Sequence, residues 1–148
     1  NSSQISDGAA ALVVMSENAL RIHKVAPLAR ITGYAAAGVE PKWVLVSTIA
    51  AVKALDVRNP WKAAEADLVE INEAFAASTL ATIRDLGLDP EKVNVNGGGI
   101  ALGHPIGASG ARIVVTLLHA LAARGLKRGV ATLCMGGGNG LALGVERL

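Results

Sequence analysis

The chain has 148 residues, of which 51% are hydrophobic and 18% charged, and its formal net charge is +2. A chain of this length and composition can bury a sizeable core and is too apolar for an intrinsically disordered protein, so we expect one packed domain. Basic residues are scattered along the sequence, and no apolar run approaches the ~20 residues of a membrane span. We therefore expect no binding to nucleic acid or to membranes.

Other features concern the compartment and the start of the chain. The single cysteine, Cys134, excludes an internal disulfide framework and a cysteine-based metal cluster, and a lone thiol is typical of a reducing compartment. We expect a cytoplasmic protein, with an organelle matrix as the alternative, and no bound metal. The start, Asn1–Gln4, has neither an initiator methionine nor the pattern of a secretion signal, which favours a fragment of a longer protein.

The first half of the chain alternates predicted strands and helices. Ala9–Met15 is continuously apolar, as expected for a strand buried on both faces. Ser16 is placed to cap a short helix that ends by Lys24. Leu28–Ala37 follows as a second strand, and Ser47–Leu55 has the apolar spacing of a helix.

The second half continues this alternation and ends in two strands. Asp67–Ile71 predicts a strand, Asn72–Leu86 a helix, and Ser109–Arg124 a longer helix closed by a glycine. Gly129–Leu133 and Leu141–Arg147 are predicted to pair through a glycine-rich hairpin. The whole pattern predicts one layered α/β domain, with a largely parallel sheet, helices on its faces and a final antiparallel pair.

The first glycine cluster surrounds a histidine. It reads GGGIALGHPIGASG over residues 97–110, and its glycines allow the backbone to approach a ligand closely. The helix that follows presents free N–H groups at its start, so His104 is a candidate general base or oxyanion donor. The alternative is a structural loop whose histidine only satisfies backbone groups.

Cys134 and Asn72 are two further candidates, each with a structural alternative. Cys134 ends a predicted buried strand and enters the glycine turn 136–138, where N–H groups and a nearby histidine can favour a thiolate. The alternative is an inert buried thiol. Asn72 opens a predicted helix, where capping alone explains an asparagine, and Glu73 would then lie in the first helical turn.

Other catalytic motifs are absent from the sequence. It contains no phosphate-binding loop of the Gly-x-x-x-x-Gly-Lys-[Ser/Thr] type, no dinucleotide-binding glycine pattern after the first strand, and no nucleophile elbow around Ser109. The two remaining histidines, His23 and His119, are expected to lie exposed on helix surfaces.

Three motifs together resemble the C-terminal half of thiolases, in particular those of the biosynthetic, acetoacetyl-CoA type. The motifs are NEAFA at 72–76, GGGIALGHPIGASGAR at 97–112 and CMGGGNG at 134–140, and residues 1–11 are also similar to the family's. The resemblance covers residues 1–148 and implies a layered thiolase domain, with a mixed five-stranded sheet flanked by helices. It also implies that this chain is one C-terminal domain, and that the N-terminal half with the nucleophilic cysteine is absent from it.

The resemblance implies a reversible Claisen condensation of acyl-CoA thioesters, in which two acetyl-CoA give acetoacetyl-CoA and CoA. His104 matches the histidine that activates the nucleophile and helps to bind the thioester oxygen. Cys134 matches the second cysteine, which removes or returns the α-proton. Asn72 matches the residue that holds a water in one oxyanion hole, and the Gly136 N–H contributes to the other.

The resemblance also implies how the substrate is held. Ser3 lies where the family contacts the pantetheine arm, and Ala74 and Phe75 would line the acyl pocket. CoA acts as a substrate, so no tightly bound cofactor is expected. The expected partners are acyl-CoA, the thiolase N-terminal half and further copies of the chain in a homo-oligomer.

One segment departs from the family pattern, and two other functions stay open. Residues 46–50 read VSTIA where the family has Gly-Pro-x-Pro-Ala, which removes a turn residue and a proline suited to the first position of a helix. One alternative is a condensing enzyme of the ketoacyl-synthase type, which pairs its nucleophile with His/His or His/Asn rather than with a second cysteine. The other is a non-catalytic module, derived from a thiolase half, that binds CoA thioesters or another protein.

Overall fold

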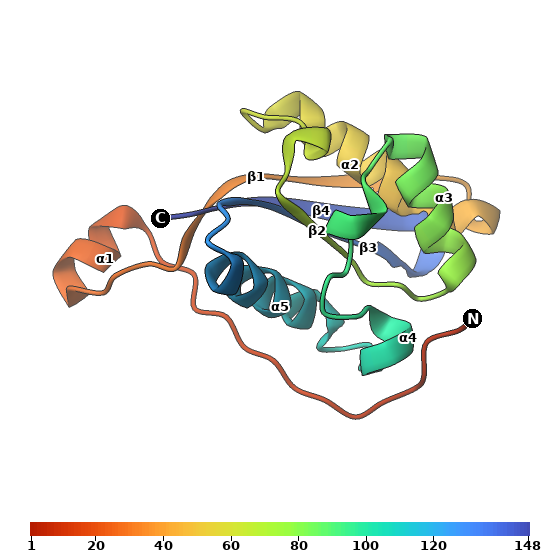
Figure 1. Ribbon diagram of the computed structural model, residues 1–148, viewed down its shortest axis with the longest axis horizontal. Helices are drawn as coiled ribbons and strands as arrows, with labels where there is room; N and C mark the ends of the chain where they lie inside the picture. The colour runs from red at the N-terminus through yellow and green to blue at the C-terminus, as the bar shows by residue number, and fades with distance from the viewer.

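The structure is a computed structural model that describes the whole chain, residues 1–148. The helices, strands and 3-10 turns (η) follow in the order α1 (Glu17–His23), β1 (Ala29–Gly38), η1 (Pro41–Val46), α2 (Ser47–Arg58), η2 (Ala63–Glu65), β2 (Leu68–Ile71), α3 (Ala76–Leu86), η3 (Pro90–Lys92), α4 (Gly99–Leu102), α5 (Ser109–Arg124), β3 (Arg128–Met135), η4 (Gly136–Gly138) and β4 (Asn139–Arg147). Figure 1 shows a central sheet with α2 and α3 on one face and α5 on the other.

The sheet is mixed and has four strands in the order β1-β4-β3-β2. The β2–β3 pair is parallel, whereas β4 is antiparallel to both of its neighbours, β1 and β3. The layered α/β fold with a final antiparallel pair is therefore confirmed. The predicted largely parallel sheet is wrong, because only one of the three strand pairs is parallel and the predicted strand over Ala9–Met15 does not form. The parallel pair brings the carboxyl ends of β2 and β3 to the same edge of the sheet, and this edge carries the candidate site.

Each face of the sheet has its own hydrophobic core. On one face, α2 packs Ala51, Val52 and Leu55 against strand residues that include Val130. On the other, α5 packs Ile113, Leu117 and Leu121 against residues that include the next residue along β3, Ala131. Because successive side chains of a strand point to opposite faces, one strand serves both cores. The apolar spacing of α2 and α5 in the sequence corresponds to these two buried faces.

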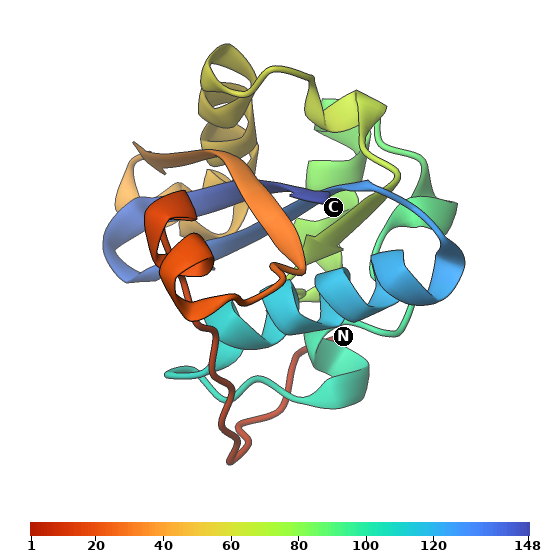
Figure 2. The ribbon, with the colours of Figure 1, turned by 90° about the vertical axis from the view of Figure 1, so that its left-hand side faces the viewer.

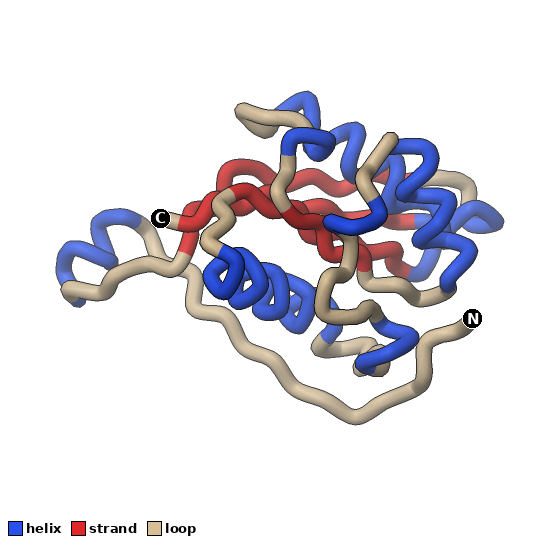
Figure 3. Tube along the Cα trace, viewed as in Figure 1, coloured by secondary structure: helices blue, strands red, loops and turns tan.

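The predicted strand over Ala9–Met15 is wrong. Residues 7–16 form no helix or strand, and Val13 and Val14 are 87% and 74% exposed. Figures 2 and 3 show this part of the chain as a long loop that leads from the N-terminus to α1. A buried strand needs a neighbouring strand and a covering layer, and the chain supplies neither here.

The sheet has one strand fewer than the five expected. The place beside β2 is taken by a single parallel bridge between Val69 and Val93, together with a hydrogen bond from the Asn94 N–H to the Val69 carbonyl (2.9 Å). The chain then turns into the first glycine cluster, with Asn94 at φ 49 and Gly97 at φ 91. A turn this close to the bridge leaves no length for a fifth strand.

The helix predicted from Asn72 begins four residues later. Residues 72–75 link β2 to α3, Glu73 adopts a φ of 57, and Phe75 occupies the N-cap position without a side-chain cap. Asn72 is therefore not a helix cap, and Glu73 is not in the first turn of a helix. Gly87 ends α3 in the left-handed conformation at φ 62, as expected.

The remaining predicted elements are present. Ser16 caps α1 by accepting from the Ala19 N–H, and the hairpin between β3 and β4 turns through η4, where Gly137 and Gly138 have φ of 79 and 89. His23 and His119 are exposed, as predicted. None of the helices combines the length and apolarity needed to cross a membrane.

Candidate active site

The candidate site begins at the carboxyl ends of the parallel strands. Asn72 directly follows β2, and its backbone N–H donates to the carbonyl of Thr132 in β3 (3.1 Å). Cys134 lies two residues beyond Thr132, so the strand pairing alone brings Asn72 and Cys134 close together. Both line one small pocket, whose walls are Leu45, Thr48, Ile71, Asn72, Glu73, Ala74, Ser78, Thr82, Leu133 and Cys134.

The His104 ring is held between two side chains. Its Nδ1 lies 2.6 Å from Oγ of Ser109, and its Nε2 lies 3.2 Å from Nδ2 of Asn72. Ser109 Oγ also donates to the Pro105 carbonyl (2.9 Å), which uses the only hydroxyl hydrogen. Nδ1 must therefore carry the ring proton and donate to Ser109, and Nε2 is left as an acceptor for the Asn72 amide.

The surroundings of His104 favour its neutral form. Burial lowers the pKa of His104 below the usual value, and the positive charge of Arg112 on α5 lowers it further. Ser109, which fixes the ring, is fully buried. The arrangement presents an uncharged imidazole whose Nε2 can accept a proton at neutral pH.

Cys134 is a partly buried free thiol at the end of β3. Burial raises the pKa of the Cys134 thiol, and a backbone hydrogen bond only partly offsets this effect. The backbone hydrogen bond therefore acts in the direction expected for an N–H group beside a thiolate, and burial acts against it. The His104 ring makes its hydrogen bonds with Asn72 and Ser109, not with Cys134.

The glycine cluster 97–100 packs directly onto the link after β2. The Gly99 N–H donates to the Asn72 carbonyl (3.0 Å), and the Ile100 N–H donates to the Glu73 carboxylate (3.2 Å). A Cβ atom on Gly99 would lie 2.5 Å from that Asn72 carbonyl oxygen. Only glycine permits this approach, so the cluster holds Asn72 through its carbonyl, while β3 holds it through its N–H.

The residues expected to bind substrate also lie together. The Ser3 N–H donates to the Ala74 carbonyl (2.9 Å), and Ser2 forms a bridge with Phe75, which is 41% exposed. The His104 N–H in turn donates to the Gln4 carbonyl (3.0 Å). The N-terminal segment therefore runs past the acyl-pocket residues and the histidine in succession.

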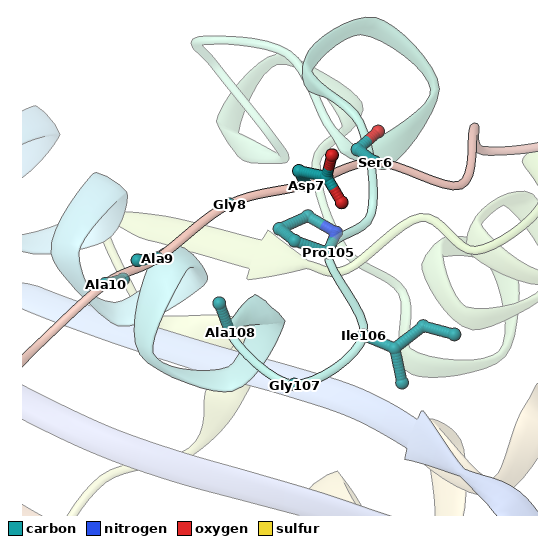
Figure 4. A pocket seen from close by; sticks show the side chains of 9 residues that line it. All are labelled: Ser6, Asp7, Gly8, Ala9, Ala10, Pro105, Ile106, Gly107 and Ala108. Carbon is teal, nitrogen blue, oxygen red and sulfur yellow. The ribbon is translucent and has the colours of Figure 1, made fainter.

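A second, open pocket lies where this segment crosses the loop after His104. Figure 4 shows the segment and the loop on its two sides, with Pro105 facing the chain at Ser6 and Asp7. The lining residues are Ser6, Asp7, Gly8, Ala9, Ala10, Pro105, Ile106, Gly107 and Ala108. This pocket carries no histidine or cysteine, so we place the candidate chemistry in the smaller pocket beside Asn72 and Cys134.

Gly136 begins the hairpin turn next to Cys134. It is exposed, and a Cβ atom built on it would meet no other atom within 4 Å. The space in front of the turn is therefore open to a ligand. No group of three or more His, Cys, Asp or Glu side chains is arranged to hold a metal ion.

The segment that departs from the family pattern still starts a helix. Ser47 opens α2, and its Oγ lies 2.7 Å from the carbonyl oxygens of both Val44 and Asn139. This hydroxyl ties the start of α2 to the β3–β4 hairpin in place of a proline. Leu45 and Thr48, on either side of the helix start, form part of the wall of the smaller pocket.

Sequence reasoning missed three residues around His104. Ser109 sets its tautomer, Arg112 affects its charge, and Glu70 contacts Arg112. One signal for the pair was present in the sequence, because a glutamate in the middle of the short apolar strand DLVEI must be buried and requires a partner.

Comparison with known proteins supports one family. Residues 25–147 match the family model described as "Thiolase, C-terminal domain". The chain is 57% identical over 149 residues to the acetyl-CoA acetyltransferase of Escherichia coli (strain K12), a match that covers 100% of this chain and 38% of that protein. It is 52% identical over 147 residues to the cytosolic acetyl-CoA acetyltransferase of Mus musculus, with 99% of this chain and 37% of that protein covered.

Solved structures show the same fold. The acetyl-CoA acetyltransferase of Bacillus anthracis superposes with a TM-score of 0.97 at 52% identity, covering 100% of this chain and 38% of that one. Human mitochondrial 3-ketoacyl-CoA thiolase in complex with CoA gives a TM-score of 0.87 at 44% identity, covering 90% and 34%.

These matches also define the extent of the relationship. The chain spans 38% of the length of the Escherichia coli relative, and the family model begins at residue 25, after the exposed N-terminal segment. A thiolase match decides against the ketoacyl-synthase alternative. The mixed sheet, the glycine loops and the match over residues 25–147 agree, and the chain belongs to the thiolase family, of which it contains the C-terminal domain.

Proposed function

We propose that residues 1–148 are the C-terminal domain of a thiolase that interconverts two acetyl-CoA with acetoacetyl-CoA and CoA. The domain supplies the acid–base groups His104 and Cys134 and the oxyanion-hole groups Asn72 and Gly136. The observation that carries this proposal is the hydrogen bond between Asn72 and Nε2 of His104, at the edge of the pocket that Asn72 shares with Cys134.

His104 is the proton acceptor for the nucleophile. A neutral imidazole with Nε2 free of its own proton takes the proton of a cysteine thiol in the N-terminal half, and the resulting thiolate attacks the thioester carbonyl. The acyl group passes to that sulfur, and CoA leaves as its thiol. The low pKa of His104, caused by burial and by Arg112, fits this role because the ring is unprotonated before the reaction begins.

Cys134 transfers the α-proton of acetyl-CoA. In condensation its thiolate removes this proton, and the carbanion attacks the acyl-enzyme carbonyl and displaces the nucleophilic cysteine as its thiolate; in thiolysis the Cys134 thiol returns the proton to carbon. Burial raises the pKa of Cys134, so the group rests as a thiol, and its conjugate thiolate is a correspondingly stronger base. The Gly136 N–H would stabilise the enolate oxygen formed in this step.

Asn72 has the atoms to hold a water in the first oxyanion hole. Its side chain is 2% exposed, its Nδ2 faces His104, and its Oδ1 has no hydrogen-bond partner in the protein. A buried acceptor without a partner costs free energy that a bound water recovers. This water and the His104 ring would together face the thioester oxygen.

The missing half and the substrate contacts complete the proposal. An N-terminal half provides the nucleophilic cysteine and covers the exposed apolar segment Ala9–Met15, while Ser3, Ala74 and Phe75 contact the pantetheine arm and the acyl group. CoA and acyl-CoA bind as substrates, with no tightly bound cofactor. We place the protein in the cytoplasm, as a homo-oligomer.

The test is thiolysis of acetoacetyl-CoA by this chain alone and mixed with a thiolase N-terminal half. We expect activity only in the mixture, and its loss in Cys134→Ala and in His104→Ala. Turnover by the chain alone would contradict the need for a second cysteine. Association of the two halves without turnover would instead favour the non-catalytic CoA-binding module.

A further inference from the structure

A buried charged pair, Glu70 and Arg112, lies beside the His104 site; Arg112 lowers the pKa of His104, and Glu70 has no part in the roles proposed above. Glu70 is in β2 with a side chain 1% exposed, and Arg112 is on the first turn of α5 with a side chain 17% exposed. Arg112 Nη1 lies 3.5 Å from Glu70 Oε2. Neither that carboxylate oxygen nor any of the three guanidinium nitrogens has a hydrogen-bond partner. Stability alone gives a weak reason for such a pair, because desolvation of the two ions opposes their attraction.

The Arg112–Glu70 pair joins the same two elements, β2 and α5, that hold the His104 ring. Glu70 is in β2, and Asn72 directly follows that strand two residues further along the chain. Ser109 and Arg112 are three residues apart on α5, so they share one side of the helix. His104 contacts Asn72 with one nitrogen and Ser109 with the other. The Arg112–Glu70 contact therefore joins the same strand and the same helix that hold the two sides of the His104 ring.

Charged and titratable groups approach the His104 loop from several elements: Arg112 from α5, Glu70 from β2, Glu73 from the link before α3, Asp7 from the N-terminal segment beside Pro105, and Cys134 from β3. Of these, Arg112 acts on His104 most directly, since its charge lowers the pKa of the ring. Glu70 does not cancel that charge, because burial and the neighbouring Glu73 raise the pKa of Glu70 to about 7 against the opposing effect of Arg112.

We propose that Arg112 and Glu70 are a positioning pair, which holds β2 and α5 so that Asn72 faces Nε2 of His104 and keeps that nitrogen free to accept a proton. The catalytic value of this arrangement rests on the proposed role of His104 as the proton acceptor. The positioning of the His104 ring does not depend on that role, and it can be measured without enzymatic turnover.

The test is an NMR pH titration of the three histidines in this chain, with the exposed His23 and His119 as internal controls. Arg112→Met removes the positive charge at similar volume, so we expect the pKa of His104 to rise. Glu70→Gln keeps Arg112 charged and resembles the protonated carboxyl present where His104 titrates, so it must not raise the pKa of His104. The double variant Arg112→Met/Glu70→Gln leaves no unpaired buried charge and must again raise it.

The outcomes separate positioning from mere folding. A pKa of His104 that rises equally in Glu70→Gln and in Arg112→Met would indicate general loosening of the site and would overturn the proposal. An unchanged pKa in Arg112→Met would also overturn it. Where a single variant does not fold, the double variant decides, because its His104 must titrate at higher pH than in the parent chain.

A second readout keeps this inference distinct from the proposed function. In the mixture with an N-terminal half, Arg112→Met should move the acid limb of the pH profile of kcat/KM to higher pH, together with the NMR titration. A shifted NMR titration in a protein that never turns over would sustain the positioning role and refute the thiolase activity. Turnover of Arg112→Met with an unchanged acid limb of the pH profile would support the thiolase activity and refute the positioning role.

Discussion

At the scale of single residues, Asn72 connects the parts of the site. It receives a hydrogen bond from Gly99, donates to Thr132 through its backbone, and faces His104 through its side chain. The same residue type at a helix start has an ordinary explanation as a cap, and the sequence could not exclude it. The structure removes that explanation, because the helix begins at Ala76.

We predict that Asn72→Ala lowers kcat/KM for acetoacetyl-CoA thiolysis by about 100- to 1000-fold, the usual cost of one oxyanion-hole group. The measurement is steady-state kinetics in the mixture with an N-terminal half. Asn96→Ala, which changes an exposed asparagine bonded only to Arg124, is the matched control and should leave the rate unchanged. Equal rates for Asn72→Ala and the parent would remove Asn72 from the site.

Glu70 gives a prediction for stability against pH. Its pKa in the folded chain is raised to about 7 from 4.5, so the folded state binds more protons than the unfolded state between these pH values. The free energy of unfolding must therefore fall as pH rises through this window, by about 3 kcal/mol at about 1.4 kcal/mol per pKa unit. The lowered pKa of His104 acts in the opposite direction, because the unfolded state then binds more protons.

Glu70→Gln isolates this contribution, since His104 is present in both proteins. We expect the variant to match the parent below pH 4.5 and to be more stable above pH 7, where the parent holds an ionised buried carboxylate. Urea unfolding at several pH values measures the difference. Parallel stability profiles for the two proteins would show that Glu70 titrates normally.

The site residues could be predicted from the sequence better than their protonation states. Glycines around His104 and after Cys134 indicated where the backbone opens to a ligand, and both residues lie at or beside the described pocket edge. The burial that raises the pKa of Cys134 could not be predicted from the sequence, because it depends on residues far away along the chain. Ser109 and Arg112 are only five and eight residues from His104, and they were missed because the sequence does not show that the loop turns the His104 ring back towards the start of α5.

At the scale of elements, the glycine cluster 97–100 sets the distance between α4 and the link after β2. We predict that Gly99→Ala destabilises the chain by about 1–3 kcal/mol, because its Cβ would lie 2.5 Å from the Asn72 carbonyl oxygen and the backbone must move. Thermal or urea unfolding measures this loss, and the displaced Asn72 should also weaken activity.

Gly110→Ala is the matched control for this prediction. Gly110 lies in the first turn of α5, where an added Cβ meets no atom within 4 Å, so alanine should be neutral or stabilising by up to about 1 kcal/mol. Similar effects of the two substitutions would mean that the close approach at Gly99 does not constrain the site.

The apolar spacing of the sequence predicted which segments form helices, but it did not predict the residues at which they begin. Apolar spacing predicted α2 and α5 because each packs one face on the sheet. The apolar run Ala9–Met15 predicted a buried segment, but it could not show which surface would cover it. No part of this chain covers it. The start of α3 was placed at Asn72 because the left-handed Glu73 leaves no mark in a sequence.

At the scale of the whole molecule, the exposed apolar segment Ala9–Met15 is the surface that we propose an N-terminal half to cover. We predict that Val13→Lys weakens association with a thiolase N-terminal half, because Val13 is 87% exposed in this chain and the proposed function places it under that half. Titration calorimetry measures the affinity. Val57→Lys on α2, where the valine is 83% exposed, is the matched control and should bind as the parent does.

The same surface affects the chain on its own. Exposed apolar side chains of this size favour association, so sedimentation of the lone chain should reveal species larger than 15.0 kDa that diminish when the N-terminal half is added. If the lone chain stays monomeric and does not bind an N-terminal half, the proposal that this half covers Ala9–Met15 is wrong.

The central claim is that Cys134, beside Asn72 and His104, moves the α-proton of acetyl-CoA. The most direct measurement is deuterium incorporation at the methyl carbon of acetyl-CoA in D2O, catalysed by the chain mixed with an N-terminal half. We predict that Cys134→Ala reduces this exchange to background, while Met135→Leu, at the next position in β3, retains it. Undiminished exchange in Cys134→Ala would contradict the claim and assign the proton transfer to another group.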